Sequence, residues 1–114
     1  MPDFMKLPND DKVQIPAAKV RDYLLSLNHP DGCTKARFFM SFGFTPGHWQ
    51  QLVDAIRKHA LANAVAQQQQ TPFGSKWVVE GPLLTPDGRN PMIRVVWFAD
   101  TGTTLPRFVT AYPL

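Results

Sequence analysis

The sequence is poor in the side chains that bind metal ions or form disulfides. Glu80 is its one glutamate, and the eight aspartates are scattered, four of them beside Pro, Gly or Asn in expected turns. The sequence therefore offers few carboxylates that could cluster to hold Mg²⁺ or act as acid–base pairs. Cys33 is the single cysteine, which excludes an internal disulfide. We expect no metal ion and no other cofactor.

Long apolar runs are also missing. No apolar stretch approaches the roughly 20 residues that span a bilayer, and the first residues lack the basic region and apolar run of a signal peptide. We therefore predict a soluble, cytoplasmic protein that does not enter a membrane. The alternative that the domain is released from a larger secreted precursor is left open.

The overall composition is that of a folded, mildly basic protein. The 114 residues suffice for one domain with its own core, and the hydrophobic content of 44% argues against disorder. Twelve Lys and Arg against nine Asp and Glu give a formal charge of +3 and a pI of about 9.3. This balance is compatible with a nucleic-acid partner. The sequence has no Walker loop, G-x-G-x-x-G, G-x-S-x-G or zinc-ligand spacing.

Hydrophobic spacing predicts a single domain, over residues 1–114, in three parts. An extended lead-in covers residues 1–15, a helical part 16–66 and an antiparallel sheet 67–114. Helices that precede an antiparallel sheet form an α+β arrangement. We predict two to three N-terminal helices packed on a C-terminal antiparallel sheet of about four strands.

The helix boundaries are predicted from prolines and capping residues. The first helix starts at Pro16, and the second runs from about Thr34, as its N-cap, to Phe42. The third begins with Thr45 as N-cap and Pro46 in its first position. We expect that helix to end near residue 63 or 66.

The strands are predicted from β-branched and aromatic residues. Residues 93–98 and 107–112 are strand-like, as are residues 76–80, whose pattern continues toward residue 84. Residues 86–89 form a turn between strands. The four glutamines at 67–70 fit either the end of the third helix or a first edge strand.

A short stretch around residues 28–39 combines an imidazole, a turn and two cations. Pro30 and Gly32 force a turn, which places His29 on a loop before the helix that begins near Thr34. Backbone N–H groups at a helix start favour anions. With Lys35 close by, this stretch suits a phosphate group.

Four residues are candidates for a catalytic role. His29 could be a general acid or base because its pKa lies near neutrality, although it could equally cap a turn. Lys35 could neutralise phosphate. Thr110 and Tyr112 could hydrogen-bond a phosphate oxygen or orient a base, or could simply pack on the sheet.

Four further cations, Arg37, Lys76, Arg94 and Arg107, are candidates for substrate binding. Arg37 could also belong to a solvated helix face. Strand alternation alone does not place Arg94, Arg107, Thr110 and Tyr112 on one face of the sheet unless a bulge intervenes.

The remaining cysteine and histidines receive no role. Cys33 lies beside a helix start, which could lower its pKa, but no pattern of a cysteine enzyme surrounds it. His48 and His59 are expected at exposed or boundary positions of the third helix.

The chain resembles a family of small bacterial proteins of unknown function over nearly its whole length. The shared residues are His29-Pro30-Asp31-Gly32, Lys35-Ala36-Arg37-Phe38-Phe39, Phe42-Gly43-Phe44, Trp49, Pro72-Phe73-Gly74, Lys76, Gly81-Pro82-Leu83, Pro86-Asp87-Gly88-Arg89, Val96-Trp97 and Val109-Thr110-Ala111-Tyr112-Pro113. Such proteins resemble the toxin domains of toxin–antitoxin and contact-dependent inhibition systems. More distantly, the element order is similar to the barnase–EndoU–colicin–RelE (BECR) superfamily of metal-independent ribonucleases.

This resemblance implies a bacterial toxin that cleaves RNA, for which a tRNA is one candidate, by transesterification through the 2′-hydroxyl. His29 would be the acid or base, Lys35 the cation that stabilises the phosphorane, and Thr110 and Tyr112 positioning or proton-relay groups. It also implies a cognate antitoxin or immunity protein, more acidic than this chain.

Two alternatives stay open. The domain could be a non-enzymatic interaction module, such as an antitoxin, immunity or accessory protein, in which the stretch at 28–39 only starts a helix. A metal-dependent nuclease is disfavoured by the single glutamate and would lose activity in EDTA.

Overall fold

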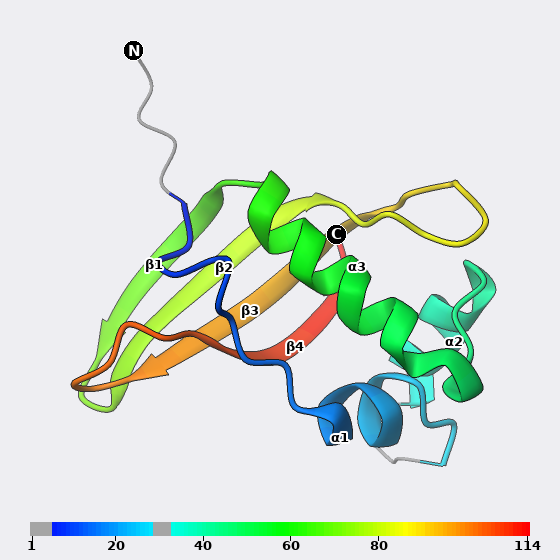
Figure 1. The fold of residues 1–114 in the computed structure, drawn as a ribbon, viewed down its shortest axis with the longest axis horizontal. Helices are drawn as coiled ribbons and strands as arrows, with labels where there is room; N and C mark the ends of the chain where they lie inside the picture. Colours follow the sequence, from blue (N-terminus) through cyan, green and yellow to red (C-terminus); the bar gives the residue numbers. More distant parts are fainter. Residues whose placement is uncertain (1–5, 29–32) are drawn as a thin grey trace.

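The computed structural model describes residues 6–28 and 33–114, which form helices followed by a four-stranded sheet (Figure 1). The strands pair antiparallel in the order β1-β2-β3-β4, which confirms the predicted α+β arrangement. The elements are α1 (Ala17–Lys19), the π-helical turn η1 (Val20–Leu24), α2 (Cys33–Ser41), the 3₁₀ turn η2 (Pro46–His48), α3 (Trp49–Ala62), β1 (Val65–Thr71), β2 (Gly74–Pro82), β3 (Met92–Asp100) and β4 (Arg107–Pro113).

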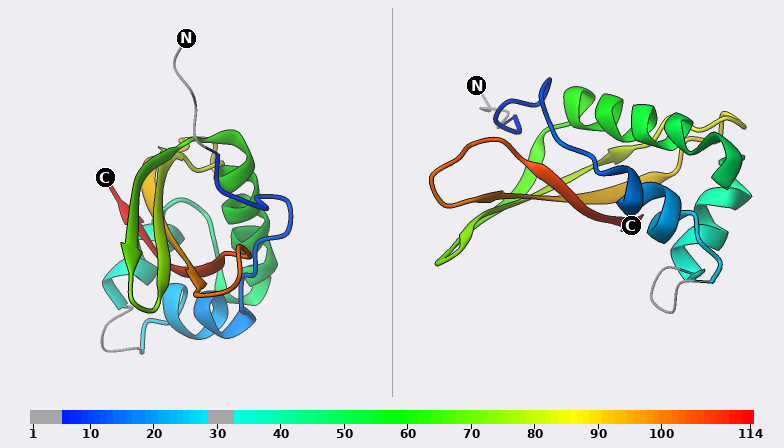
Figure 2. Two further views of the ribbon diagram at one scale, coloured as in Figure 1. Left: turned by 90° about the vertical axis from the view of Figure 1, so that its left-hand side faces the viewer. Right: turned by 60° about the horizontal axis from the view of Figure 1, so that its bottom comes forward.

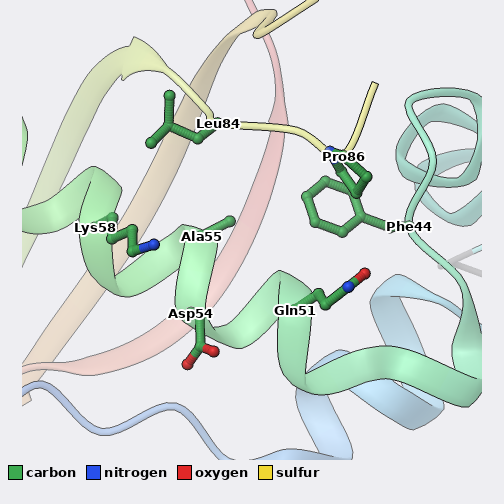
Figure 3. Close-up of a pocket in the computed structure, with 7 residues that line it drawn as sticks. All are labelled: Phe44, Gln51, Asp54, Ala55, Lys58, Leu84 and Pro86. Atoms are coloured by element: carbon green, nitrogen blue, oxygen red, sulfur yellow. The ribbon is translucent and has the colours of Figure 1, made fainter. Parts of the chain in front are cut away.

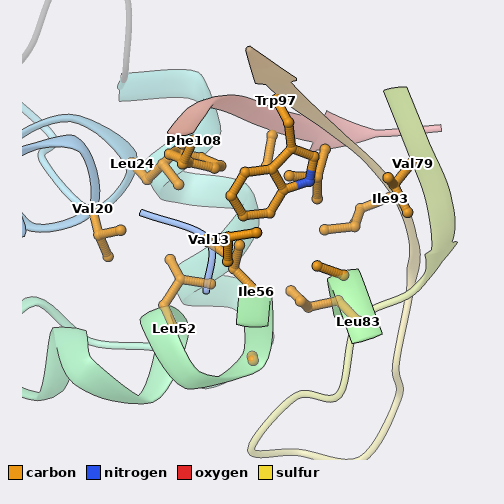
Figure 4. Packing of buried hydrophobic residues seen from close by; sticks show 14 of the residues in the cluster. Val13, Val20, Leu24, Leu52, Ile56, Val79, Leu83, Ile93, Trp97 and Phe108 are labelled. Atoms are coloured by element: carbon orange, nitrogen blue, oxygen red, sulfur yellow. The ribbon is translucent and has the colours of Figure 1, made fainter. Parts of the chain in front are cut away.

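The core lies between α3 and one face of the sheet (Figures 1 and 4). Leu52 and Ile56 are one turn apart on α3 and are fully buried against this face, as the helical spacing predicts. Trp97 of β3 fills the centre and contacts Phe108 of β4 edge to face, with ring centroids 5.8 Å apart. Because alternate strand residues point to opposite faces, the intervening side chains lie on the other side of the sheet.

We call this second side the open face, because α3 does not cover it (Figure 2). Its central valines, Val78 and Val96, are almost fully buried beneath longer flanking side chains. The open face comprises Lys76, Val78 and Glu80 of β2, Arg94, Val96 and Phe98 of β3, and Arg107, Thr110 and Tyr112 of β4.

A bulge in β4 decides which of its side chains reach the open face. Val96 pairs with Thr110, but the next residue, Trp97, pairs with Phe108, so Val109 is an extra residue in the ladder. The bulge moves Arg107 to the same side as Thr110. The bulge is the one condition under which the sequence allowed the polar residues of β3 and β4 to share a face. The structure therefore places Arg94, Arg107, Thr110 and Tyr112 on one face of the sheet.

One of the two predicted helix caps differs in the structure. Helix α2 begins at Cys33, so Thr34 is inside its first turn and is not the N-cap. Thr45 does occupy the N-cap position, with Pro46 next to it, but the helical turn it precedes is the 3₁₀ turn η2, and its side chain makes no capping hydrogen bond. Thr45 Oγ1 instead lies 3.3 Å from His48 Nδ1. Short 3₁₀ turns such as η2 are common at the starts of α-helices.

The glutamine run forms an edge strand, the second of the two predicted alternatives. Helix α3 ends at Ala62, and β1 pairs with β2 along one side while its glutamines are exposed. At the other edge of the sheet, the lead-in covers β4. The amide of Phe108 donates to the carbonyl of Gln14 at 2.8 Å, and Val13 is buried. This contact protects the edge from pairing with another chain.

Within residues 6–28 and 33–114, no helix is both long and apolar enough to cross a membrane.

His59 is buried, so the prediction of an exposed or boundary position for it is wrong. Its side chain is 2% exposed between α3 and β2, and Nε2 donates to the carbonyl oxygen of Gly81 at 3.1 Å. Burial lowers the pKa of His59, although carbonyl groups of Gly81 and Ile93 act in the opposite direction. A larger residue at position 81 would force the Asn63 side chain to move, because a Cβ there would lie 2.1 Å from the side-chain oxygen of Asn63.

Buried His59 predicts that the fold loses stability in mild acid. Its folded-state pKa lies below the ordinary value of 6.5, so the unfolded chain binds the proton more readily. The contribution is fully present above pH 6.5 and is lost as the pH falls through the lowered pKa. We expect the Tm of the His59→Gln variant to change less between about pH 8 and about pH 5 than that of the wild type. His48→Gln, at an exposed position, is the control and should retain the wild-type pH dependence.

Candidate functional site

The candidate site is centred on Lys35, which brings three separate elements together. Its ammonium group donates to Tyr23 Oη at 2.7 Å and to Thr110 Oγ1 at 2.8 Å. Tyr23 belongs to η1, Lys35 to α2 and Thr110 to β4. Both hydrogen bonds are partly buried, so they fix the ammonium position at the border between the helices and the open face.

Aromatic rings surround the same ammonium group. Lys35 Nζ lies 5.0 Å from the centroid of the Tyr23 ring and 5.9 Å from that of Tyr112. The negative ring faces stabilise a cation at such distances. Among the described residues, no carboxylate forms an ion pair with Lys35. Neutral hydroxyls and rings thus hold a positive charge, an arrangement that suits an anionic ligand.

Tyr112 connects Lys35 to a second cation. Arg94 pairs with Tyr112 across β3 and β4, and its guanidinium lies 5.7 Å from the tyrosine ring centroid. Arg94 Nε also donates to Glu80 Oε2 at 2.6 Å. Hydrogen bonding to Tyr112, followed by that to Glu80, raises the already high pKa of Arg94. Arg94 therefore stays charged, but a carboxylate already neutralises it.

The four predicted binding cations lie in different settings. Arg107 Nη1 bonds Asp100 Oδ2 at 2.6 Å and is paired, as Arg94 is. Lys76 is half-buried on the open face beside Phe98. Arg37 is exposed on α2, two residues after Lys35, and two residues on a helix rotate a side chain to the opposite side. The structure thus brings Arg94, Arg107 and Lys76 to the face of Thr110, but not Arg37.

His29, the predicted acid or base, lies outside the described residues, as do Pro30, Asp31 and Gly32. Within the part of the chain that the structure describes, no group of three or more His, Cys, Asp or Glu side chains could hold a metal ion.

Tyr23 is the site residue that sequence reasoning missed. Its ring packs against the core, as apolar residues of a helix do. A signal was present, because a tyrosine hydroxyl near a core usually finds a polar partner. The partner could not be named, since η1 is a π-helical turn and its side chains depart from α-helical spacing.

A separate cavity lies on the α3 side of the sheet (Figure 3). It occupies about 250 Å³ between α3 and the loop that joins β2 to β3. None of the residues that line it belongs to the open face. These are Phe44, Gln51, Asp54, Ala55, Lys58, Leu84 and Pro86. None of them belongs to the Lys35 cluster, so the cavity and the candidate site are different places on the protein.

Comparison with known proteins places the chain in a family. A family model described as a domain of unknown function (DUF6883) matches residues 6–114. The chain belongs to this family. No curated protein sequence matches this DUF6883 domain.

A solved structure shares the fold of the DUF6883 domain. It is a chain of a contact-dependent growth inhibition toxin–immunity protein complex from Klebsiella pneumoniae 342, with a TM-score of 0.68 and 19% sequence identity. The match covers 88% of this chain and 98% of the other. At this identity the similarity establishes a common fold and nothing about individual residues.

The Lys35 contacts predict an energetic coupling across the site. Lys35→Met and Thr110→Val each remove one partner of a hydrogen bond to a charged group. We expect a double-mutant cycle on the free energy of unfolding, measured by urea denaturation, to give a coupling of about 1 kcal/mol. The exposed Thr101, on the turn after β3, provides the control. Thr101→Val should be additive with Lys35→Met, and equal couplings for both threonines would contradict the assignment.

Proposed function

We propose that this DUF6883 domain is a toxin that cleaves RNA without a metal ion, through attack of a 2′-hydroxyl on the adjacent phosphate. The observation that carries the proposal is the Lys35 ammonium, held by Tyr23 and Thr110 and not paired with any described carboxylate. Such a cation can stabilise the negative charge that develops on the non-bridging oxygens of the phosphorane.

The proposed reaction needs two proton transfers. A base takes the proton of the 2′-hydroxyl while this oxygen attacks phosphorus. The bond from phosphorus to the 5′-oxygen breaks, and an acid protonates the leaving oxygen, which yields a 2′,3′-cyclic phosphate and a 5′-hydroxyl. We assign His29 as the acid or the base and Lys35 as the cation facing the phosphorane.

The two strand residues would serve the same phosphate. Thr110 already accepts a hydrogen bond from Lys35, so it positions the ammonium and leaves its hydroxyl proton for a phosphate oxygen. Tyr112 lies between Lys35 and Arg94, where its hydroxyl could orient substrate or relay a proton. Lys76 would bind the RNA backbone, and the carboxylate-paired Arg94 and Arg107 would contact the RNA beside it, with Arg37 contributing from the far side of α2.

A cognate protein partner is part of the proposal. The solved structure with this fold comes from a complex of a toxin with its immunity protein. This chain carries a formal charge of +3, so an acidic antitoxin or immunity protein would be attracted to it.

The second candidate is a non-enzymatic interaction module. The comparison supports this candidate because the Klebsiella complex contains an immunity protein as well as a toxin. In that case Lys35, Tyr23 and Thr110 would only join α2 to the sheet. Substitution of Lys35 distinguishes the two candidates. In a ribonuclease the substitution abolishes RNA cleavage, whereas in an interaction module neither the wild type nor the variant cleaves RNA.

Induced expression in bacteria tests the toxin. We expect the wild type to stop growth and to yield discrete RNA fragments on a gel, whereas His29→Ala and Lys35→Met should do neither. Lys58→Met, on the exposed side of α3, is the matched control and should remain toxic. Normal growth and intact RNA with the wild type would favour the interaction module. Toxicity of soluble Lys35→Met would remove Lys35 from the mechanism.

Cleavage of RNA by the purified protein should persist in EDTA, because none of the proposed steps uses a metal ion. The measurement is the rate of fragment formation with and without chelator. Loss of cleavage that added Mg²⁺ restores would instead identify a metal-dependent nuclease.

A further inference from the structure

A second group of side chains crosses the open face beside the Lys35 cluster. Lys76, Phe98 and Arg107 lie opposite one another on β2, β3 and β4. This row is one pleat away from the row of Val96 and Thr110, about 7 Å along the strands. It therefore adjoins the candidate site on the same surface.

At the centre of the row, the guanidinium of Arg107 lies over the aromatic ring of Phe98. The Arg107 guanidinium lies 5.1 Å from the centroid of the half-buried Phe98 ring. Its Nη1 donates to Asp100 Oδ2 at 2.6 Å, which favours this orientation of the guanidinium. Arg107 remains 44% exposed, so part of the guanidinium plane is accessible from solvent.

The ion pair decides what this group can bind. Because Asp100 already neutralises Arg107, a phosphate would gain little there and would be repelled by the carboxylate. A planar, fixed guanidinium backed by a ring is instead a stacking surface for a nucleobase. The adjoining Lys76 has no carboxylate partner among the described residues, and it can take a phosphate.

We propose that Phe98 and Arg107 form a nucleobase subsite for single-stranded RNA, with Lys76 binding the adjoining phosphate. The proposal deepens the proposed function and rests on it. A base must leave the duplex stack before it can stack on protein, so the ligand is a single strand or an unpaired loop. The subsite would hold a nucleotide next to the one whose phosphate reaches Lys35.

A similar group elsewhere in the protein has a different task and supplies a control. Arg89 lies 4.3 Å from the Phe42 ring centroid and pairs with Asp87 at 2.6 Å. It also donates to the carbonyl of Ser41, so it ties the loop between β2 and β3 to the end of α2. Among the residues that the structure describes, no side-chain hydrogen bond ties Arg107 to a helix, and Arg107 lies on the open face, which Lys35 enters.

Binding of a labelled, fully 2′-O-methylated RNA oligonucleotide of mixed sequence, followed by fluorescence anisotropy, tests the subsite without cleavage. Loss of one stacked base should weaken binding about tenfold in Phe98→Leu. Arg107→Lys should weaken it to a similar extent, because lysine keeps the charge and loses the plane. Arg89→Lys and Phe73→Leu, the latter at a 78% exposed ring on the turn between β1 and β2, should bind as the wild type does.

The outcomes separate the subsite from the nuclease when cleavage of unmodified RNA is measured in parallel. Wild-type affinity in both Arg107→Lys and Phe98→Leu overturns the subsite while leaving cleavage intact. Binding that the variants weaken, without any cleavage by the wild type, supports the subsite and overturns the nuclease. Absence of binding by the wild type overturns both.

Two further results bear on the subsite. If Phe98→Leu has a lowered Tm, the well-folded Arg107→Lys decides the question alone. If the variants bind RNA normally but lose affinity for a cognate immunity protein, the row is a protein interface and the subsite is wrong.

Discussion

The bulge at Val109 is the constraint on which the open face depends. Phe108 and Ala111 must both face the core, where they pair with Trp97 and Val95. They are three residues apart, and strict alternation would put them on opposite faces. One extra residue between them removes the conflict. The same extra residue places Arg107 on the side of Thr110, so core packing determines which polar groups stand together.

The two faces of the sheet consequently differ in the side chains that they carry. The α3 face is closed by Leu52 and Ile56 and contains His59, whose charged form is disfavoured by burial. The open face presents charged groups and aromatic rings around the buried Val78 and Val96. Lys35 enters this face from α2, and its hydrogen bonds to Tyr23 and Thr110 also hold the helices against β4.

Carboxylates distinguish the cations of the open face. Arg94 and Arg107 each have an acidic neighbour, Glu80 and Asp100, whereas Lys35 contacts hydroxyls and rings. A paired guanidinium offers a plane and directed donors, whereas an ammonium that no described carboxylate pairs offers net charge. This division favours Lys35 as the group facing a phosphate and Arg107 as a surface for a base.

Local periodicity and residue type predict the α+β order, the α3 spacing and three of the four strands, and they leave β1 open between a helix end and a strand. Residue type also made Lys35, Thr110 and Tyr112 candidates, but no local pattern predicts that Lys35 and Thr110 are in contact. The remaining features depend on contacts between distant parts of the chain. The β4 bulge depends on pairing with β3, the burial of His59 depends on Gly81 across the core, and Tyr23 meets Lys35 only after η1, α2 and β4 have packed. Such contacts join distant parts of the chain, and no local pattern encodes them.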